Sequence, residues 1–161
     1  MSQDIFNRLK QDHDLHRDLL GKLAAAEGGD GARDALLARF TKEVKAHAAA
    51  EEQALYSTML RKPDTTAETR HSVAEHKEIE DLLNDLAATE SATAEWSDKF
   101  DHLRHRYLHH IDEEEEDNFP EYEKYLTDED VQHMRSVFDK RKPAEKAQAE
   151  VTPEKLEEAK E

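Results

Sequence analysis

The sequence of 161 residues contains no cysteine. Disulfide bonds, thiolate metal sites and iron–sulfur clusters are therefore excluded, because each of them requires cysteine sulfur. Glycine and proline are scarce, at four residues each, so regular helix is little interrupted. Hydrophobic residues make up 36% of the chain and charged residues 39%. This composition leaves room for a narrow apolar stripe on each helix and for little more.

Positive charge is also scarce, since 23 lysines and arginines stand against 39 aspartates and glutamates, for a net charge of −16. Nucleic acid and anionic membrane surfaces are therefore not expected as partners, because both repel such a chain at long range. No run approaches the roughly 20 apolar residues that span a membrane, and the N-terminal MSQDIFNRLKQD has no apolar signal core. We expect a single-domain cytoplasmic protein.

Histidine, in contrast, occurs ten times, and several of these histidines follow a pattern. In HAAAEEQALY and HIDEEEEDNFP a histidine is followed by a glutamate one helical turn later, as His47 by Glu51 and as His110 by Glu114. Residues at this spacing lie on one face of an α-helix, so each pair offers an imidazole and a carboxylate to a common point. One such pair alone would be weak evidence, because a chain rich in Glu and His produces some by chance.

A second pair of histidines turns the pattern into an internal repeat. KQDHDLHRDLLGKLA, around His13, aligns with SVAEHKEIEDLLNDLA, around His76. The step in residue number from His13 to His76 equals the step from His47 to His110, and we call this step the repeat offset. The chain therefore contains two copies of one helical hairpin, in each of which a lone histidine is followed by an HxxxE motif at the same distance along the chain.

The spacing also predicts where the helices turn. Two antiparallel helices bring ligands to one height when the turn lies midway between the ligands in sequence. The three midpoints fall in GGDG (28–31), beside Pro63 and within residues 89–95, which all carry turn or capping signals. We predict an all-α protein, an up-down-up-down antiparallel four-helix bundle with a short fifth C-terminal helix. The expected helices cover about residues 4–27, 32–60, 66–88, 94–117 and 128–140.

The C-terminal part is expected to divide into a helix and a tail. After Pro120 the chain is expected to turn and then to form the fifth helix, capped by Thr127, which covers one end or flank of the bundle. The domain would thus occupy residues 1–141. Residues 142–161 are poor in hydrophobic side chains and contain two prolines, so we expect a charged, disordered tail there.

Metal-ligating side chains occupy six stripe positions where packing alone asks for Leu or Val. These residues are His13, His47, Glu51, His76, His110 and Glu114. Burying a carboxylate without a partner is costly, and here two of like charge would be buried close together. The stripes contain no Lys or Arg that could neutralise them, whereas two divalent or trivalent cations would. Neutral imidazoles with carboxylates suit iron, manganese or zinc, and bundle cores recurrently hold such sites.

The motifs, taken in order, resemble the hemerythrin-like HHE cation-binding domains. They are Asp12-His13, HAAAEE, Glu75-His76 and HIDEEEEDNFP, and the resemblance covers about residues 4–140. It implies a non-haem di-iron centre inside a four-helix bundle, with two iron ions, an oxygen bridge and a small open position for a ligand.

The resemblance also implies how six side chains share the two metals. Each iron would take two histidines, and two glutamates would bridge the irons. The residues in these roles are His13 and His47 for one iron, His76 and His110 for the other, and Glu51 and Glu114 for the bridges.

One departure from the oxygen-carrying hemerythrins affects the expected function. Those proteins have a further histidine one helical turn from the third-helix ligand, whereas Ser72 and Glu80 flank His76 here. Tyr107 and His16 are the candidates for an extra ligand; the alternatives are ordinary core packing for Tyr107, and contact with a ligand or partial burial for His16.

We therefore expect a protein that binds O2, peroxide or NO for sensing, iron handling or a stress response. The first alternative is a di-iron enzyme with peroxidase-like, catalase-like or NO-reducing activity. The second is a metal-free helical interaction module.

Other acidic residues and histidines are given simpler interpretations. Glu52 and Glu115 would replace their neighbours as ligands if the register were shifted by one position. His71 forms an ExxH with Glu68, but no second copy exists, so a ferritin-like site is disfavoured. Four further histidines are expected on the solvated surface: His102, His105, His109 and His133.

Overall fold

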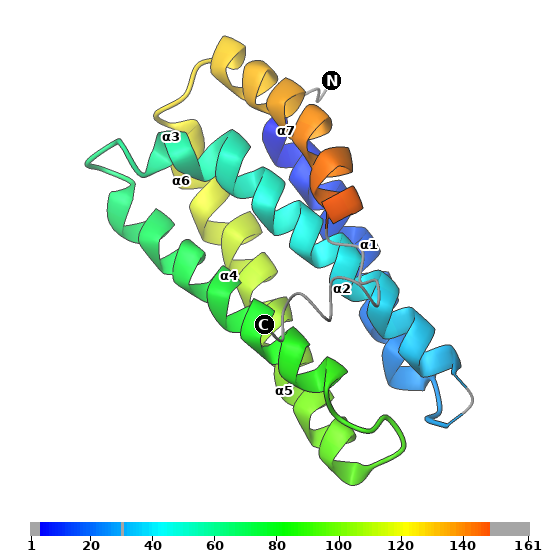
Figure 1. Cartoon of the computed structure of the whole chain (residues 1–161). Coiled ribbons are helices and arrows are strands. Elements are labelled where there is room, and N and C mark those ends of the chain that lie inside the picture. Colours follow the sequence, from blue (N-terminus) through cyan, green and yellow to red (C-terminus); the bar gives the residue numbers. More distant parts are fainter. Residues whose placement is uncertain (1–3, 30, 149–161) are drawn as a thin grey trace, which may run out of the picture.

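The structure is a computed structural model that describes residues 4–29 and 31–148. Within these residues the regular structure is entirely helical (Figure 1). The elements in chain order are α1 (Ile5–Ala25), α2 (Ala32–Glu51), η1 (Glu52–Tyr56), α3 (Ser57–Met59), α4 (Thr66–Ala87), α5 (Ala94–Glu113), η2 (Glu114–Asn118), α6 (Phe119–Glu123) and α7 (Asp128–Gln148).

Two of the long helices are interrupted by π-helical turns. In η1 and η2 the backbone stays helical, so α2, η1 and α3 form one continuous rod and α5, η2 and α6 form another. With α1 and α4 these rods make the antiparallel four-helix bundle seen in Figure 1, and α7 is the additional helix. The predicted fold class is confirmed. Both π-turns begin at or next to a predicted ligand, and π-turns are frequent at functional sites.

The turns form where the sequence predicts them, because capping residues and glycines are available there. The Asp4 side chain accepts a hydrogen bond from the Asn7 amide (2.9 Å), and the Thr93 hydroxyl accepts one from the Trp96 amide (3.2 Å). Between α1 and α2, Gly31 adopts a positive φ of 87°, a conformation that other residues rarely take.

Two apolar clusters lie at different levels of the bundle. One contains buried side chains from α1, α2, α4 and α5: Leu19, Leu20, Leu23, Phe40, Leu83, Leu86, Trp96, Phe100 and Leu103. The other contains Ile5, Phe6, Leu9, Leu55, Tyr56, Met59, Phe119, Tyr122 and Phe138. In α1 the two histidines lie between Leu9 of one cluster and Leu19 of the other. The predicted ligands therefore form a polar layer between two apolar cores.

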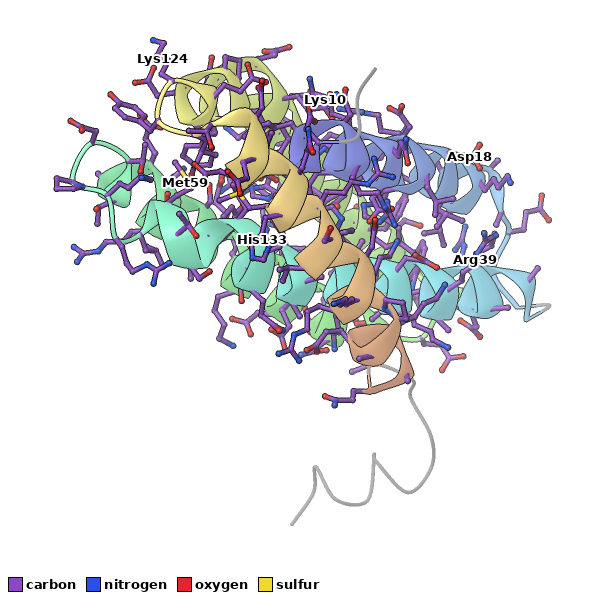
Figure 2. The ribbon with its side chains drawn as sticks, turned by 90° about the horizontal axis from the view of Figure 1, so that it is seen from above. Lys10, Asp18, Arg39, Met59, Lys124 and His133 are labelled. Carbon is purple, nitrogen blue, oxygen red and sulfur yellow. The ribbon has the colours of Figure 1, made fainter. Side chains whose placement is uncertain are left out.

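Helix α7 crosses α1 and α2 on the outside of the bundle (Figures 1 and 2). Thr127 caps it as expected, since its hydroxyl accepts from the Asp130 amide (3.1 Å). The predicted end near Lys140 was wrong, because α7 continues through Pro143 to Gln148. Lys142 forms an ion pair with Asp12 of α1 (2.9 Å) and holds this extension on the bundle.

The predicted turn after Pro120 lies later than expected. Pro120 belongs to the first turn of α6, directly after the π-turn, where its missing amide hydrogen is tolerated. The rod ends at Glu123. The predicted tail begins inside α7, and its residues 149–161 lie outside the described residues, so the division into bundle and tail stays a prediction.

Candidate metal centre

Glu51 connects the two hairpins in the polar layer. Its Oε1 lies 3.7 Å from Nε2 of His47, one helical turn earlier on α2, and 3.2 Å from Nε2 of His76 on α4. The Glu51 side chain is completely buried. This carboxylate thus faces one histidine from each hairpin.

Glu114 has the same role in the second half of the repeat. Its Oε1 lies 3.0 Å from Nε2 of His110 on α5 and 3.7 Å from Nε2 of His13 on α1. Glu51, Glu114, His76 and His110 each offer an atom to a set that lies within 4.8 Å. These four residues come from three of the four bundle helices and can therefore hold one cation. His13 faces the carboxylate of Glu114 as well.

The histidines are grouped in pairs within each hairpin. The rings of His13 and His47 have centroids 5.1 Å apart, and those of His76 and His110 are 4.9 Å apart. Each glutamate reaches from its own pair to the other. The structure thus brings together all six predicted ligands, with two imidazoles on each side of two carboxylates.

The inward atoms of this layer are not satisfied by hydrogen bonds within the described part of the chain. The buried atoms without a hydrogen-bond partner include His13 Nε2, His47 Nε2, His110 Nε2, Glu51 Oε1, Glu51 Oε2 and Glu114 Oε1. Buried polar atoms are nearly always paired in folded proteins, so this concentration calls for a bound group. All are nitrogen and oxygen ligands, which metal ions bind.

The outer ring nitrogens, in contrast, are all bonded to carboxylates. His47 Nδ1 donates to Asp12 (2.8 Å), and His110 Nδ1 donates to Glu75 (2.9 Å). Asp12 and Glu75 are separated by the repeat offset and are therefore counterparts. This bond places a proton on Nδ1, so Nε2, which is directed at the centre, is the ring nitrogen available to bind a metal.

A second repeated pair orients the other two histidines. His13 Nδ1 donates to Glu115 (2.7 Å), and His76 Nδ1 donates to Glu52 (3.1 Å). Glu52 and Glu115 are also separated by the repeat offset. The sequence suggested Glu52 and Glu115 only as substitutes for Glu51 and Glu114. In the structure each accepts a hydrogen bond from a predicted histidine ligand, on the side of the ring that faces away from the centre. The offset of the repeat was the signal that could have identified this role.

The electrostatics of the layer favour uptake of a cation. Burial and the charge of Glu114 raise the pKa of Glu51 well above 4.5. Burial opposes ionisation of Glu114, yet His110 holds the pKa of that carboxyl well below 4.5. Burial lowers the pKa of His110, but Glu114 outweighs it and raises this pKa to about 9. The layer thus favours protons on Glu51 and His110, and a metal ion would compensate the same charge in their place.

Tyr56 is a site residue that sequence reasoning missed. Its hydroxyl donates to Glu114 Oε2 (2.8 Å) and lies 3.5 Å from His76 Nε2. Burial and then Glu114 raise the pKa of this phenol well above 10. The repeat places Phe119 at the equivalent position, stacked near His13 with centroids 6.1 Å apart. The signal available in the sequence was that the two copies of the repeat differ at this position, with a polar residue in one and an apolar residue in the other.

The two candidates for an extra ligand are bonded to each other. His16 Nδ1 lies 2.6 Å from the Tyr107 hydroxyl, and both side chains are buried. The His16 ring is 5.2 Å from that of His47, and its Nε2 has no hydrogen-bond partner among the described residues. Burial and then His47 lower the pKa of His16, so this imidazole is neutral. The pair lies beside the six ligands.

A cavity of about 400 Å³ connects the layer with the surface between α2 and α4. Its walls are mainly apolar, formed by Val44, Ala48, Val73, Ile79 and Leu83 among others. His47, His76, His110 and Tyr107 line its inner part. The His76 side chain is 8% exposed, more than the other predicted histidine ligands. A small molecule can therefore reach the predicted ligands by this route.

The histidines predicted on the surface are exposed, as expected. These are His102, His105, His109 and His133, the last labelled on α7 in Figure 2; His71 is exposed as well. No helix within residues 4–29 or 31–148 has the length and apolar character that crossing a bilayer requires.

The chain is similar to known proteins in both sequence and fold. The family described as hemerythrin HHE cation binding domain matches residues 4–122. The fold is similar to the crystal structure of a hemerythrin HHE cation binding domain-containing protein from Mycobacterium kansasii, with a TM-score of 0.81 and 23% sequence identity. That similarity covers 92% of this chain and 90% of the other. No curated protein matches the sequence.

Proposed function

Because the chain belongs to the hemerythrin HHE cation-binding family, we propose that it binds two non-haem iron ions and, through them, a small ligand such as O2, peroxide or NO. The proposed ligands are His13, His47, Glu51, His76, His110 and Glu114. Sensing, iron handling and a stress response are the roles that such binding serves.

The observation that carries this proposal is the contrast between the two sides of the ligand histidines. Their Nδ1 atoms are bonded to carboxylates at 2.7–3.1 Å. On the inner side, Nε2 of His13, His47 and His110 and three carboxylate oxygens lack hydrogen bonds. A layer built only for packing would not orient four imidazoles and leave their inner nitrogens unpaired.

The number and kind of ions follow from the donor set. Two histidine pairs on either side of two carboxylates suit two ions that share the carboxylates. Imidazole and carboxylate together favour iron, manganese or zinc over magnesium or calcium, and the absence of cysteine disfavours soft metals. Bound ferrous ions would supply electrons to the small ligand.

The protein's own residues determine which molecules reach the centre. The mainly apolar walls of the cavity favour the entry of small uncharged molecules. Tyr107 lines the inner cavity and is hydrogen-bonded to His16. When His16 Nδ1 donates to it, the Tyr107 hydroxyl keeps its own proton for a hydrogen bond to a molecule in the cavity.

The hydrogen bond between Tyr107 and His16 favours the alternative, a di-iron enzyme that turns over peroxide or NO. Turnover of these molecules needs protons inside a dry site, and the Tyr107 and His16 pair is suited to relay one. A stable adduct with O2 would support a binding protein. Repeated consumption of peroxide or NO in the presence of a reductant would support the enzyme.

The deciding experiment measures metal content and the visible spectrum of protein purified with iron. We expect two irons per chain and near-ultraviolet charge-transfer bands, both lost in a His47→Ala, Glu114→Ala double variant. His133→Ala, an exposed position on α7, is the matched control and keeps both. Wild-type protein that contains no metal after iron loading, yet folds as well as the variant, would overturn the proposal in favour of a metal-free helical module.

A further inference from the structure

A second group of histidines and glutamates lies where α4 and α5 face each other near the surface. His71 Nε2 is 3.5 Å from Glu75 Oε2 and 3.8 Å from Glu113 Oε1. His109 Nε2 is 3.3 Å from Glu113 Oε2. One ligand atom from each of His71, Glu75 and Glu113 lies within 4.8 Å of the other two.

The spacing along each helix is the one used by the inner ligands. Glu75 follows His71 by one helical turn on α4, and Glu113 follows His109 by one turn on α5. Each pair thus offers an imidazole and a carboxylate on one helix face. None of these four residues is among the six proposed inner ligands.

The internal repeat shows how the first hairpin compensates the charge of the carboxylate equivalent to Glu75. Asp12, the counterpart of Glu75, has its outer oxygen Oδ1 bound by Arg8 (2.6 Å) and by Lys142 of α7 (2.9 Å). Arg8 precedes His71 by the repeat offset and is therefore its counterpart. In the first hairpin two permanent cations compensate this buried carboxylate.

The second hairpin replaces those cations with metal-ligating groups. The counterparts of His109 and Glu113 in the first hairpin are Ala46 and Ala50. Both alanines are completely buried. On the α4 and α5 side, His71 and His109 are each 58% exposed and Glu113 is 27% exposed. Arg8 and Lys142 bind the carboxylate of Asp12 directly in the first hairpin. In the second hairpin the equivalent Glu75 faces the exposed His71, and Arg106 acts on it only through its charge.

We propose a second, mononuclear site for a divalent transition-metal ion on the outside of the bundle, formed by His71, Glu75, His109 and Glu113. Two neutral imidazoles and two carboxylates match the charge of a divalent ion, and the mixed donor set favours zinc, manganese or ferrous iron over calcium or magnesium. The exposed side leaves positions for water in the coordination shell.

The outer site touches the inner centre through Glu75. Its Oε1 accepts the hydrogen bond from His110 Nδ1 (2.9 Å), while Oε2 faces His71 (3.5 Å). An ion at the outer site therefore holds the carboxylate that orients one of the proposed inner ligands. The outer site can nevertheless bind an ion whether or not the inner centre holds iron, since the two share no ligand.

Zinc titration of the full-length, iron-loaded protein by calorimetry tests the proposal. We expect one zinc ion per chain beyond the iron. His71→Ala and, separately, Glu113→Gln should each weaken this binding by roughly tenfold or more, as loss of a contact in a metal shell commonly does. Iron content should stay unchanged in both variants, which separates this site from the inner centre.

His105→Ala is the matched control, because His105 is exposed on α5 and lies one helical turn before His109. It should bind zinc like the wild type. Equal zinc affinity in wild type and His71→Ala, or loss of binding in His105→Ala, would overturn the proposal. If the inner centre proves not to hold iron, titration of the metal-free chain still decides the question, since His71→Ala must lose one zinc equivalent relative to wild type.

Discussion

Glu51 and Glu114 are buried carboxylates in one small volume, and their surroundings push their pKa values in opposite directions. Burial and the charge of Glu114 raise the pKa of Glu51. Burial works against ionisation of Glu114 too, but His110 lowers its pKa. In the metal-free protein the surroundings therefore favour the neutral acid at Glu51 and the carboxylate at Glu114.

This difference predicts the behaviour of Glu51→Gln. In the metal-free protein the neutral amide replaces a carboxyl group whose neutral form the site favours, so the free energy of unfolding should change by less than about 1 kcal/mol. In the iron-loaded protein the variant should lose iron and the stability that iron adds. Thermal unfolding with and without iron measures both effects. Glu116→Gln, at an exposed position in η2, is the control; a Glu51→Gln variant that keeps two irons would refute the proposed ligand role.

The side chain of Arg33 joins the turn between α1 and α2 to the turn between α4 and α5, at one end of the bundle. Arg33 donates to the carbonyl oxygens of Ala26 (3.1 Å) and Ser91 (2.7 Å), and its guanidinium lies 4.3 Å from the centre of the Trp96 ring. The loop backbones approach so closely that a Cβ at Gly28 would lie 2.5 Å from the Ser91 carbonyl oxygen.

Two glycine substitutions should therefore have opposite effects on stability. Gly28→Ala should destabilise the protein by about 1–3 kcal/mol, because backbone must move to admit the methyl group. Gly21→Ala, in α1 with no atom within 4 Å of the added Cβ, should stabilise it by about 0.5–1 kcal/mol through helix propensity. Urea unfolding of the two variants beside the wild type measures the difference. A Gly28→Ala variant as stable as Gly21→Ala would mean that the two turns do not pack in this way.

On both sides of Pro143, helix α7 is held on α2 by ion pairs. Glu43 of α2, which is buried, forms ion pairs with Lys142 (3.4 Å) and with Lys146. Burial acts to raise the pKa of Glu43, but Lys146 and Lys142 more than offset it and lower the pKa below 4.5. These contacts explain why the helix extends beyond Pro143.

A depressed carboxyl pKa gives a defined dependence on pH. The stabilisation from Glu43 should be complete above its ordinary pKa of 4.5 and should be lost as the pH falls through the lowered value. Glu43→Gln should thus cost about 0.5–1 kcal/mol at pH 7, with a difference from wild type that shrinks in acid. Urea unfolding across this pH range measures it, with Glu95→Gln, at an exposed i,i+4 pair, as the control. A difference that persists unchanged in acid would contradict the ion-pair interpretation.

For the whole molecule, the sequence predicts those features that the repeat encodes through spacing. The common level of the six predicted ligands and the positions of the turns follow from it, because the height of a residue in an antiparallel bundle depends on distance along the chain. The hydrogen-bond partners of the histidine ring nitrogens, such as Glu115 for His13, depend on which helices lie next to each other in the bundle. The length of α7 depends on contacts of Lys142 with Asp12 and Glu43, which lie far earlier in the chain. Helical periodicity contains no information about such contacts.

The arrangement of the helices indicates what metal ions bound at the polar layer would do for the fold. α1 packs mainly on α2 and α4 mainly on α5, so the two hairpins share fewer contacts with each other than within themselves. Glu51 of α2 reaches His76 of α4, and Glu114 of η2, which continues α5, reaches His13 of α1. Ions bound to these carboxylates would therefore join one hairpin to the other. Both apolar clusters remain without them, so the helices themselves do not require metal.

Removing iron should accordingly lower stability and leave the helices in place. A ligand at one hundred times its dissociation constant adds about 2.7 kcal/mol per site, which corresponds to roughly 5–10 °C in melting temperature for a domain of this size. Circular dichroism at room temperature should show little loss of helix after chelation, while the melting temperature falls. His133→Ala should show the same fall, and the His47→Ala, Glu114→Ala variant should show none. A melting temperature that chelation leaves unchanged in the wild type would mean that the polar layer does not bind metal tightly enough to join the hairpins.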